Sequence, residues 1–369
     1  MQKNLYDYLI LFFEPVAAFL KDEDVSEILI NGARQIYVEK RGKLVHTDAV
    51  FSSEEALEAA AVNVARSVGR YLNKEVPILD ARLPDGSRFH AVIPPVSRVG
   101  TVVSIRKFRK DMLDMKSLVE FGSISEEGAQ LLSAIVRLHK NLIVSGATSS
   151  GKTTVLNVIS GLIEPDQRII VIEDSSELQL QQEHIVSFET REPDKHGKGE
   201  ITIRDHLVSA LRLRPDRLII GEVRGGEALD LLQALNTGHS GSMSTIHANS
   251  AHDSLDRMET CALMSGIDIP LKALREQVAA AIHVVVQTAR LSDGSRKVTA
   301  IAEVCGLKDG DYAVNDIYAY HIEHVADDGT ISGHFGGTGY VPTFVKEAAM
   351  RRLPLDMSIF NKEKERTRS

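Results

Sequence analysis

The stretch of sequence that decides the fold is Val144-Ser145-Gly146-Ala147-Thr148-Ser149-Ser150-Gly151-Lys152-Thr153-Thr154. Two glycines bracket a tight loop whose backbone amides can converge on phosphate oxygens, and the helix that follows presents its positive end to the same charge. Lys152 would reach the β and γ phosphates, and the Thr153 hydroxyl would ligate Mg²⁺. The spacing therefore predicts a nucleoside triphosphate site, whose cradle consists of Ala147, Thr148, Ser149, Ser150, Gly151, Lys152, Thr153 and Thr154.

The flanks of this loop carry the strand and the helix that such a site needs. Residues 141–145 read as a short buried strand, and apolar residues from Val155 to Leu162 recur at helical spacing behind the loop. Alternation of short apolar strands with helical segments predicts an α/β domain with a largely parallel sheet covered by helices. The further strands are expected at residues 168–174, 217–222, 242–247 and 283–287.

The residues before this domain show a mixed pattern of strands and helices. Strands are expected at residues 27–30, 35–39 and 100–106. Ser52 and Glu55 form a capping box that begins a helix, which continues to Leu72. A polar and charged segment separates the two patterns. We therefore place an N-terminal α/β domain at residues 1–112, a linker at 113–127 and the second domain at 128–369.

Two carboxylates stand at the ends of predicted strands, where ligands bind such sheets. Glu222 ends the apolar strand that begins at Arg217, and an acid in that place organises Mg²⁺ and the attacking water. Glu173 closes the preceding strand, where it would support the same metal. Both residues are therefore candidate catalytic residues and metal ligands. The alternative for Glu173 is that its carboxylate only caps the loop that follows.

Two histidines, His239 and His247, lie in the glycine- and hydroxyl-rich segment around the strand expected at 242–247. This segment would sense the γ phosphate, and a histidine there would bind the nucleotide, act as a general base or merely hydrogen-bond a turn. We take His247 as a candidate catalytic residue and His239 as a candidate nucleotide-binding residue. No cysteine joins them, so the segment does not resemble a zinc site.

Arginines are candidates for the phosphate groups, because phosphoryl transfer gains from added positive charge in a fixed fork geometry. Spacing alone does not choose among them. The candidates are Arg82, Arg88, Arg106, Arg204, Arg212, Arg214 and Arg224.

The composition excludes several other classes of protein. The chain has 369 residues, of which 43% are hydrophobic and 25% charged, as in an ordinary globular protein with room for two domains. Its net charge of -8 disfavours a protein that coats nucleic acid. Cys261 and Cys305 are far apart and encode neither a zinc module nor a disulfide framework, which favours a reducing compartment. No stretch is apolar for long enough to span a membrane directly.

Together these residues resemble the traffic ATPases of type II and type IV secretion machineries, most closely the CpaF/TadA-like branch that serves Flp-type pili. The resemblance runs from Val25–Gly32 through Asp80–Arg88 and Ser104–Phe108 to Arg214–Arg217 and beyond Asn249. The four nucleotide boxes of that family match this chain in order and spacing. They fall at Gly146–Thr154 (Walker A), Glu173–Glu177 (aspartate box), Leu218–Glu222 (Walker B) and Thr237–His247 (histidine box).

The resemblance implies a RecA-like P-loop NTPase domain preceded by a smaller mixed α/β, PAS-like domain. It implies that ATP and Mg²⁺ are the cofactors, that Arg106 and Arg88 clamp the γ phosphate, and that Lys152, Glu173, Glu222 and His247 form the catalytic set. It also implies a cytoplasmic homohexamer that works at an inner-membrane platform protein of a pilus or secretion machine, without nucleic acid.

Two other functions are compatible with the same loop. A RecA-like motor that acts on DNA or RNA would need a basic stripe or an aromatic stacking platform, and the chain has no tryptophan. A nucleotide-gated assembly scaffold would bind nucleotide with negligible turnover, which the full set of acids disfavours.

Overall fold

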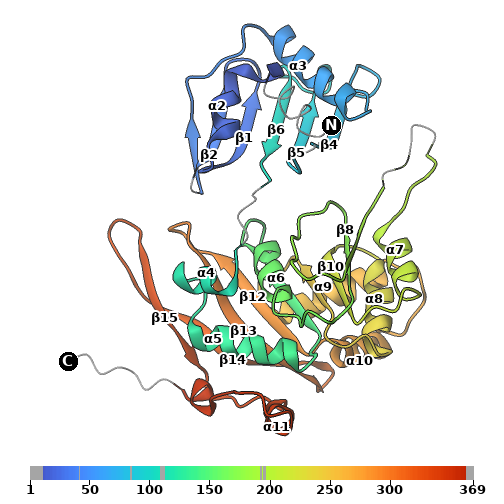
Figure 1. Cartoon of the computed structure of the whole chain (residues 1–369), viewed down its shortest axis with the longest axis vertical. Coiled ribbons are helices and arrows are strands. Elements are labelled where there is room, and N and C mark those ends of the chain that lie inside the picture. The colour runs from blue at the N-terminus through green and yellow to red at the C-terminus, as the bar shows by residue number, and fades with distance from the viewer. Residues whose placement is uncertain are drawn as a thin grey trace. The chain divides into compact units, whose positions relative to one another are not determined.

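The computed structural model describes residues 11–40, 42–83, 85–108, 113–191, 193 and 197–362. The chain divides into two compact units, residues 1–111 and residues 112–369 (Figure 1). The first unit has one hydrophobic core and the second unit has two. Within the described residues, no helix combines the length and the apolar character needed to cross a bilayer.

The first unit is built on a six-stranded sheet in the order β3-β2-β1-β6-β5-β4. All of its neighbouring strands pair antiparallel. Side chains alternate between the two faces of each strand, and the apolar set, such as Phe89 and Ile105, is buried. The strands are β1 (Val25–Asn31), β2 (Ile36–Lys40), β3 (Lys43–His46), β4 (Ile78–Arg82), β5 (Arg88–Val92) and β6 (Val102–Arg106).

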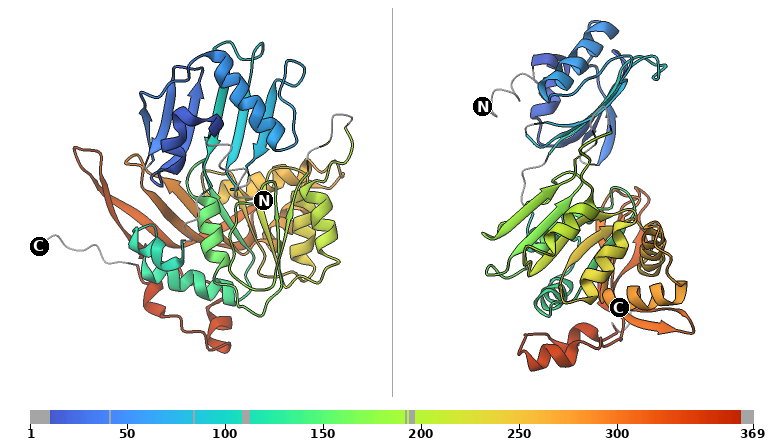
Figure 2. Two further views of the ribbon diagram at one scale, coloured as in Figure 1. Left: turned by 45° about the horizontal axis from the view of Figure 1, so that its top comes forward. Right: turned by 90° about the vertical axis from the view of Figure 1, so that its right-hand side faces the viewer.

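Helices cover one face of this sheet (Figure 2). They are η1 (Glu14–Val16), α2 (Ala17–Lys21) and α3 (Glu54–Ser67). The α3 helix begins one residue later than the sequence predicts, because the hydroxyl of Ser53, not that of Ser52, accepts the amide of Ala56 at 3.1 Å. The unit is therefore a mixed α/β domain, whereas its PAS-like character stays a prediction.

The second unit is built on a nine-stranded sheet in the order β15-β14-β13-β12-β7-β11-β10-β8-β9. The strands from β12 to β9 are parallel, as the sequence predicts. The parallel strands are β7 (Leu142–Gly146), β8 (Ile169–Glu173), β9 (Ile185–Glu189), β10 (Arg217–Val223), β11 (Met243–Ile246) and β12 (Val284–Arg290). An antiparallel extension follows, with β13 (Arg296–Lys308), β14 (Asp311–Val325) and β15 (Ile331–Gly337).

Helices lie on both faces of this sheet, so that the unit has three layers and two cores (Figure 1). One face carries α4 (Met115–Glu120), α5 (Glu126–Arg137) and α6 (Lys152–Ser160), with α11 (Val345–Met350) and η2 (Met357–Phe360). The other carries α7 (Ile203–Ala210), α8 (Glu227–Asn236), α9 (Ala251–Leu263) and α10 (Leu271–Ala281). The RecA-like α/β arrangement expected from the sequence is confirmed.

The segment at 113–127, expected as a linker, is part of the second unit. It contains α4 and the start of α5, and both Leu118 and Ile124 are buried in the core on the α6 face. The polar residues that suggest a linker are partly helix caps, since Asp114 and Ser125 each accept an amide at the start of a helix.

Candidate active site

The phosphate-type loop leaves β7 at Gly146 and enters α6 at Lys152. Gly151 precedes the helix with a φ of 96°, a conformation that glycine adopts without steric cost. A side chain at Gly146 would collide with the hydroxyls of Ser150 and Thr288. The first amides of α6 have no acceptor within the helix, and such a helix end suits an anion. Thr153 is half-buried and Thr154 exposed in the first turn of α6.

Two residues on the β12–β13 hairpin support this loop, and sequence analysis missed both. The buried Thr288 hydroxyl donates to the carbonyl of Ser145 at 2.9 Å and lies 2.8 Å from the Ser150 hydroxyl. Arg296 donates through Nε to the carbonyl of Ser149 at 3.0 Å. No sequence signal identifies them, because strand pairing alone brings them to the loop from about 140 positions further along the chain.

Lys152 is a buried cation at the centre of the site, with only 7% of its surface exposed. Its Nζ donates to the carbonyl of Ala147 at 3.0 Å and lies 3.1 Å from Nδ1 of His247. Burial lowers the pKa of Lys152, an effect that the charge of Glu222 opposes. A desolvated ammonium gains strongly from an anionic ligand, which is what a phosphate supplies.

His247 connects Lys152 to Glu222. Its Nδ1 accepts from Lys152, so the ring proton belongs on Nε2, which lies 3.1 Å from Oε1 of Glu222. Burial lowers the pKa of His247, with the charge of Glu222 opposing, and this favours the neutral ring. The structure therefore brings three of the predicted catalytic residues together, at the carboxyl ends of β7, β10 and β11.

Glu222 also pairs with Arg224, which lies two residues further along the chain. Nε and Nη2 of Arg224 donate to Oε1 and Oε2 of Glu222 at 3.0 and 3.2 Å. Nη1 donates to Asp174 at 3.2 Å. The Glu222 side chain is 19% exposed, so these contacts form at the edge of the solvent.

Glu173 lies at the carboxyl end of β8, beside the Walker B strand, and is 3% exposed. A side chain at Gly221 would come within 2.9 Å of its Cγ, so the two strands are in close contact there. Oε1 of Glu173 accepts the amides of Glu177 and Leu178 at 2.9 and 3.1 Å. This is the loop-capping contact that the sequence left as the alternative, and metal ligation by Glu173 stays a prediction.

His239 lies away from the phosphate-type loop within this unit. It precedes β11, whereas His247 follows it, so the length of the strand separates the two histidines. Nδ1 of His239 lies 3.2 Å from the carbonyl of Ala234, at the end of α8. His239 therefore lies at the amino end of the parallel strands, whereas Lys152 lies at their carboxyl end. The nucleotide contact predicted for His239 gains no support from this unit.

The first unit holds Arg88 and Arg106 side by side on neighbouring strands. Arg106 of β6 pairs with Arg88 of β5, and Arg88 pairs with Arg82 of β4. Paired residues share one face of an antiparallel sheet, and this face is opposite to the apolar one that holds Phe89 and Ile105. On its other side Arg106 pairs with Glu27 of β1, so this face carries a carboxylate beside the three arginines.

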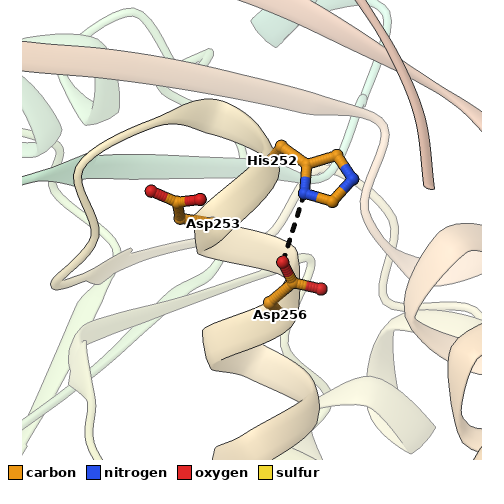
Figure 3. Close-up of side chains that lie close together, drawn as sticks. All are labelled: His252, Asp253 and Asp256. Atoms are coloured by element: carbon orange, nitrogen blue, oxygen red, sulfur yellow. Dashed lines mark hydrogen bonds and ion pairs between the residues drawn. The ribbon is translucent and has the colours of Figure 1, made fainter. Parts of the chain in front are cut away.

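A group of possible metal ligands lies elsewhere, on α9 (Figure 3). Nδ1 of His252 lies 3.2 Å from Asp256 and its Nε2 lies 3.2 Å from Asp311, while Asp253 has an oxygen within 4.8 Å of ligand atoms of His252 and Asp256. Because both ring nitrogens already face carboxylates, the contacts are explained as a link between α9 and β14.

A strand, a glycine loop and a helix, with an acidic strand end beside them in a parallel sheet, define a P-loop NTPase with a RecA-like fold. Residues 12–321 match the family described as Type II/IV secretion system protein, and the chain belongs to that family. As a member of it, the protein is an ATPase.

Relatives agree with this assignment, and a solved structure agrees with the fold. A putative conjugal transfer protein of Mycobacterium tuberculosis is 34% identical over 321 residues, which cover 85% of this chain and 90% of that protein. The type IV secretion system protein VirB11 of Bartonella henselae is 31% identical over 326 residues, covering 78% and 90%. The ATPase DotB of Legionella pneumophila has the same fold, with a TM-score of 0.56 and 18% identity over 78% of this chain and 79% of that one.

Proposed function

We propose that this protein hydrolyses ATP with Mg²⁺ and thereby powers a type IV secretion or Flp-type pilus machine. The observation that supports this proposal most directly is the continuous set of contacts from Lys152 through His247 to Glu222, next to the phosphate-type loop. A surface glutamate or a satisfied core histidine would not be connected to a buried lysine in this way.

In this mechanism the residues of the second unit have separate tasks. The amides from Ala147 to Thr154 and the ammonium of Lys152 hold the β and γ phosphates. Glu222 accepts a proton from the attacking water. His247 holds the carboxylate of Glu222 close to Lys152, which binds the phosphates.

The oxygen donors of the site suit Mg²⁺, which prefers hydroxyl and carboxylate ligands. Thr153 and Glu173 would hold the ion directly and Glu222 would hold it through a water, and the ion would neutralise charge on the phosphates.

We assign the γ phosphate contact of the first unit to Arg106 and Arg88. Their adjacent register on β5 and β6 supports this assignment, because two guanidinium groups on one face of a sheet bind an anion more strongly than either alone.

The proposed assembly and location rest on the sequence resemblance and on the names of the relatives. We propose a homohexamer at the cytoplasmic face of the inner membrane, where a platform protein of the machine binds it. The names of two relatives that match most of this chain mention conjugal transfer and type IV secretion, which supports this setting. The CpaF-like branch within the family rests on the sequence resemblance alone.

The test measures phosphate release and nucleotide binding on the purified protein with three variants. We expect Lys152→Ala to lose both activities, Glu222→Gln to bind ATP without hydrolysing it, and Thr299→Val, on β13, to match the wild type. Normal turnover by Glu222→Gln would contradict the role of that residue. Stimulation by DNA or RNA would favour a nucleic-acid motor, and binding without turnover in the wild type would favour an assembly scaffold.

The partner and the ring require separate measurements. A pull-down from membranes with Glu222→Gln, in ATP, is expected to retain an inner-membrane protein, and light scattering is expected to give the mass of six subunits.

A further inference from the structure

Arg224 occupies an unusual position, because one guanidinium group contacts both acidic strand ends of the site. Its Nε and Nη2 form a two-pronged contact with the carboxylate of Glu222, and its Nη1 reaches Asp174 behind β8. The hydrogen bond to Glu222 raises the pKa of Arg224, and burial opposes that rise. The charge is therefore permanent at any pH at which the protein is folded.

Backbone contacts fix the turn that carries Arg224. The amides of Arg224 and Gly225 both donate to Oε1 of Glu227, at 2.7 and 2.8 Å. A side chain at Gly226 would come within 2.7 Å of the backbone of Ser265, so the turn lies directly against the end of α9. A side chain on a fixed turn loses less entropy when it orders a neighbour.

The contacts of Glu222 leave a defined acceptor. A carboxylate offers about four acceptor positions, two on each oxygen. Oε1 receives Nε of Arg224 and Nε2 of His247, whereas Oε2 receives Nη2 of Arg224. Among the described residues, these contacts leave one acceptor position, on Oε2, for a further donor.

We propose that Arg224 is the positioning residue of the hydrolytic reaction, which orients Glu222 so that its remaining Oε2 acceptor position receives the proton of the attacking water. The proposal rests on the role of Glu222 proposed above. Arg224 does not itself touch the nucleotide; it acts through Glu222, and it connects that residue to the aspartate box through Asp174.

An arginine is required for this task. The planar guanidinium matches both carboxylate oxygens and has a third prong for Asp174, whereas a lysine ammonium is a single point charge on a flexible stem. Lysine would therefore keep the charge but not the orientation.

The test compares Arg224→Ala and Arg224→Lys with Arg351→Ala, which removes an equally charged, similarly exposed side chain paired with Glu347. We expect Arg224→Ala to lower kcat by about 10²-fold, as a small displacement of a general base does. KM and the dissociation constant of a fluorescent ATP analogue are expected to stay unchanged, since the phosphate loop is intact. The kcat of Arg224→Lys is expected to lie between those of Arg224→Ala and the wild type, and the kcat of Arg351→Ala to match the wild type.

Chemical rescue separates orientation from a general structural effect. Guanidinium ion at non-denaturing concentration is expected to restore part of the kcat of Arg224→Ala, whereas sodium chloride at equal ionic strength is not. A kcat that stays at the wild-type value or rises would overturn the proposal, as would full activity in Arg224→Lys or the absence of rescue.

Failure of the underlying role of Glu222 has a different signature. If Glu222→Gln turns over normally, the role of Glu222 fails regardless of Arg224. If Glu222→Gln is inactive while Arg224→Ala is normal, only the positioning role fails.

Discussion

Thr288→Val tests the support that the β12–β13 hairpin gives to the phosphate loop. The two side chains have nearly the same shape, so the substitution removes a hydroxyl group and leaves the volume unchanged. Thr288 is 1% exposed, and its hydroxyl contacts both the Ser145 carbonyl and the Ser150 hydroxyl. Both partners are themselves buried.

The expected loss follows from these two contacts. A buried polar group that loses its partner costs about 1–3 kcal/mol, and the Ser150 hydroxyl can rotate to recover part of this. We therefore expect the free energy of unfolding to fall by about 2 kcal/mol. The loop also becomes less ordered, so the dissociation constant for ATP is expected to rise by up to about tenfold, which corresponds to 1.4 kcal/mol.

Urea unfolding and titration with a fluorescent ATP analogue measure the two effects. Thr299→Val is the matched control, because its hydroxyl makes only a 3.4 Å contact with the Gln287 carbonyl on the same hairpin. We expect the control to change stability by less than about 0.5 kcal/mol. Equal stability and affinity for Thr288→Val and Thr299→Val would refute the reasoning.

Two further predictions concern the frame of the second unit. Arg217 is fully buried, and its guanidinium donates to Gln167, Gly241 and Val136. Because a lysine cannot reach all three acceptors, Arg217→Lys is expected to lower the free energy of unfolding, measured in urea, by about 3 kcal/mol. Arg212→Lys serves as the exposed control. Nδ1 of His283 accepts the amide of Asn141 at 2.9 Å, and burial lowers the pKa of His283 below its ordinary value of 6.5. The unfolded chain therefore binds more protons than the folded one near and below that pH, so stability falls as the pH is lowered through 6.5. His283→Asn is expected to weaken this pH dependence of the free energy of unfolding. An unchanged pH profile in the variant would contradict the role of His283.

Much of the fold follows from local sequence patterns. The five strands predicted in the second domain all form. Short apolar runs of this length are typical of buried strands in an α/β domain. The first unit likewise forms the three predicted strands. At 113–127 the pattern misleads, because Asp114 and Ser125 are polar as helix caps and not as parts of a linker.

The candidate site is only partly predictable in the same way. Lys152, Glu222 and His247 carry their chemistry in local motifs, and the sheet brings them together. The direction of β11 separates His239 from them, which spacing within a motif does not reveal. Thr288 and Arg296 reach the loop by pairing of distant strands, and Arg224 differs from the other arginines only in what it contacts.

The most direct test of the account is a structure of Glu222→Gln with Mg²⁺ and ATP. We expect intact ATP, with its β and γ phosphates on the amides from Ala147 to Thr154 and on Lys152, and the amide of the new glutamine beside Arg224. ATP bound away from this loop, or a loop closed to nucleotide, would contradict the central claim.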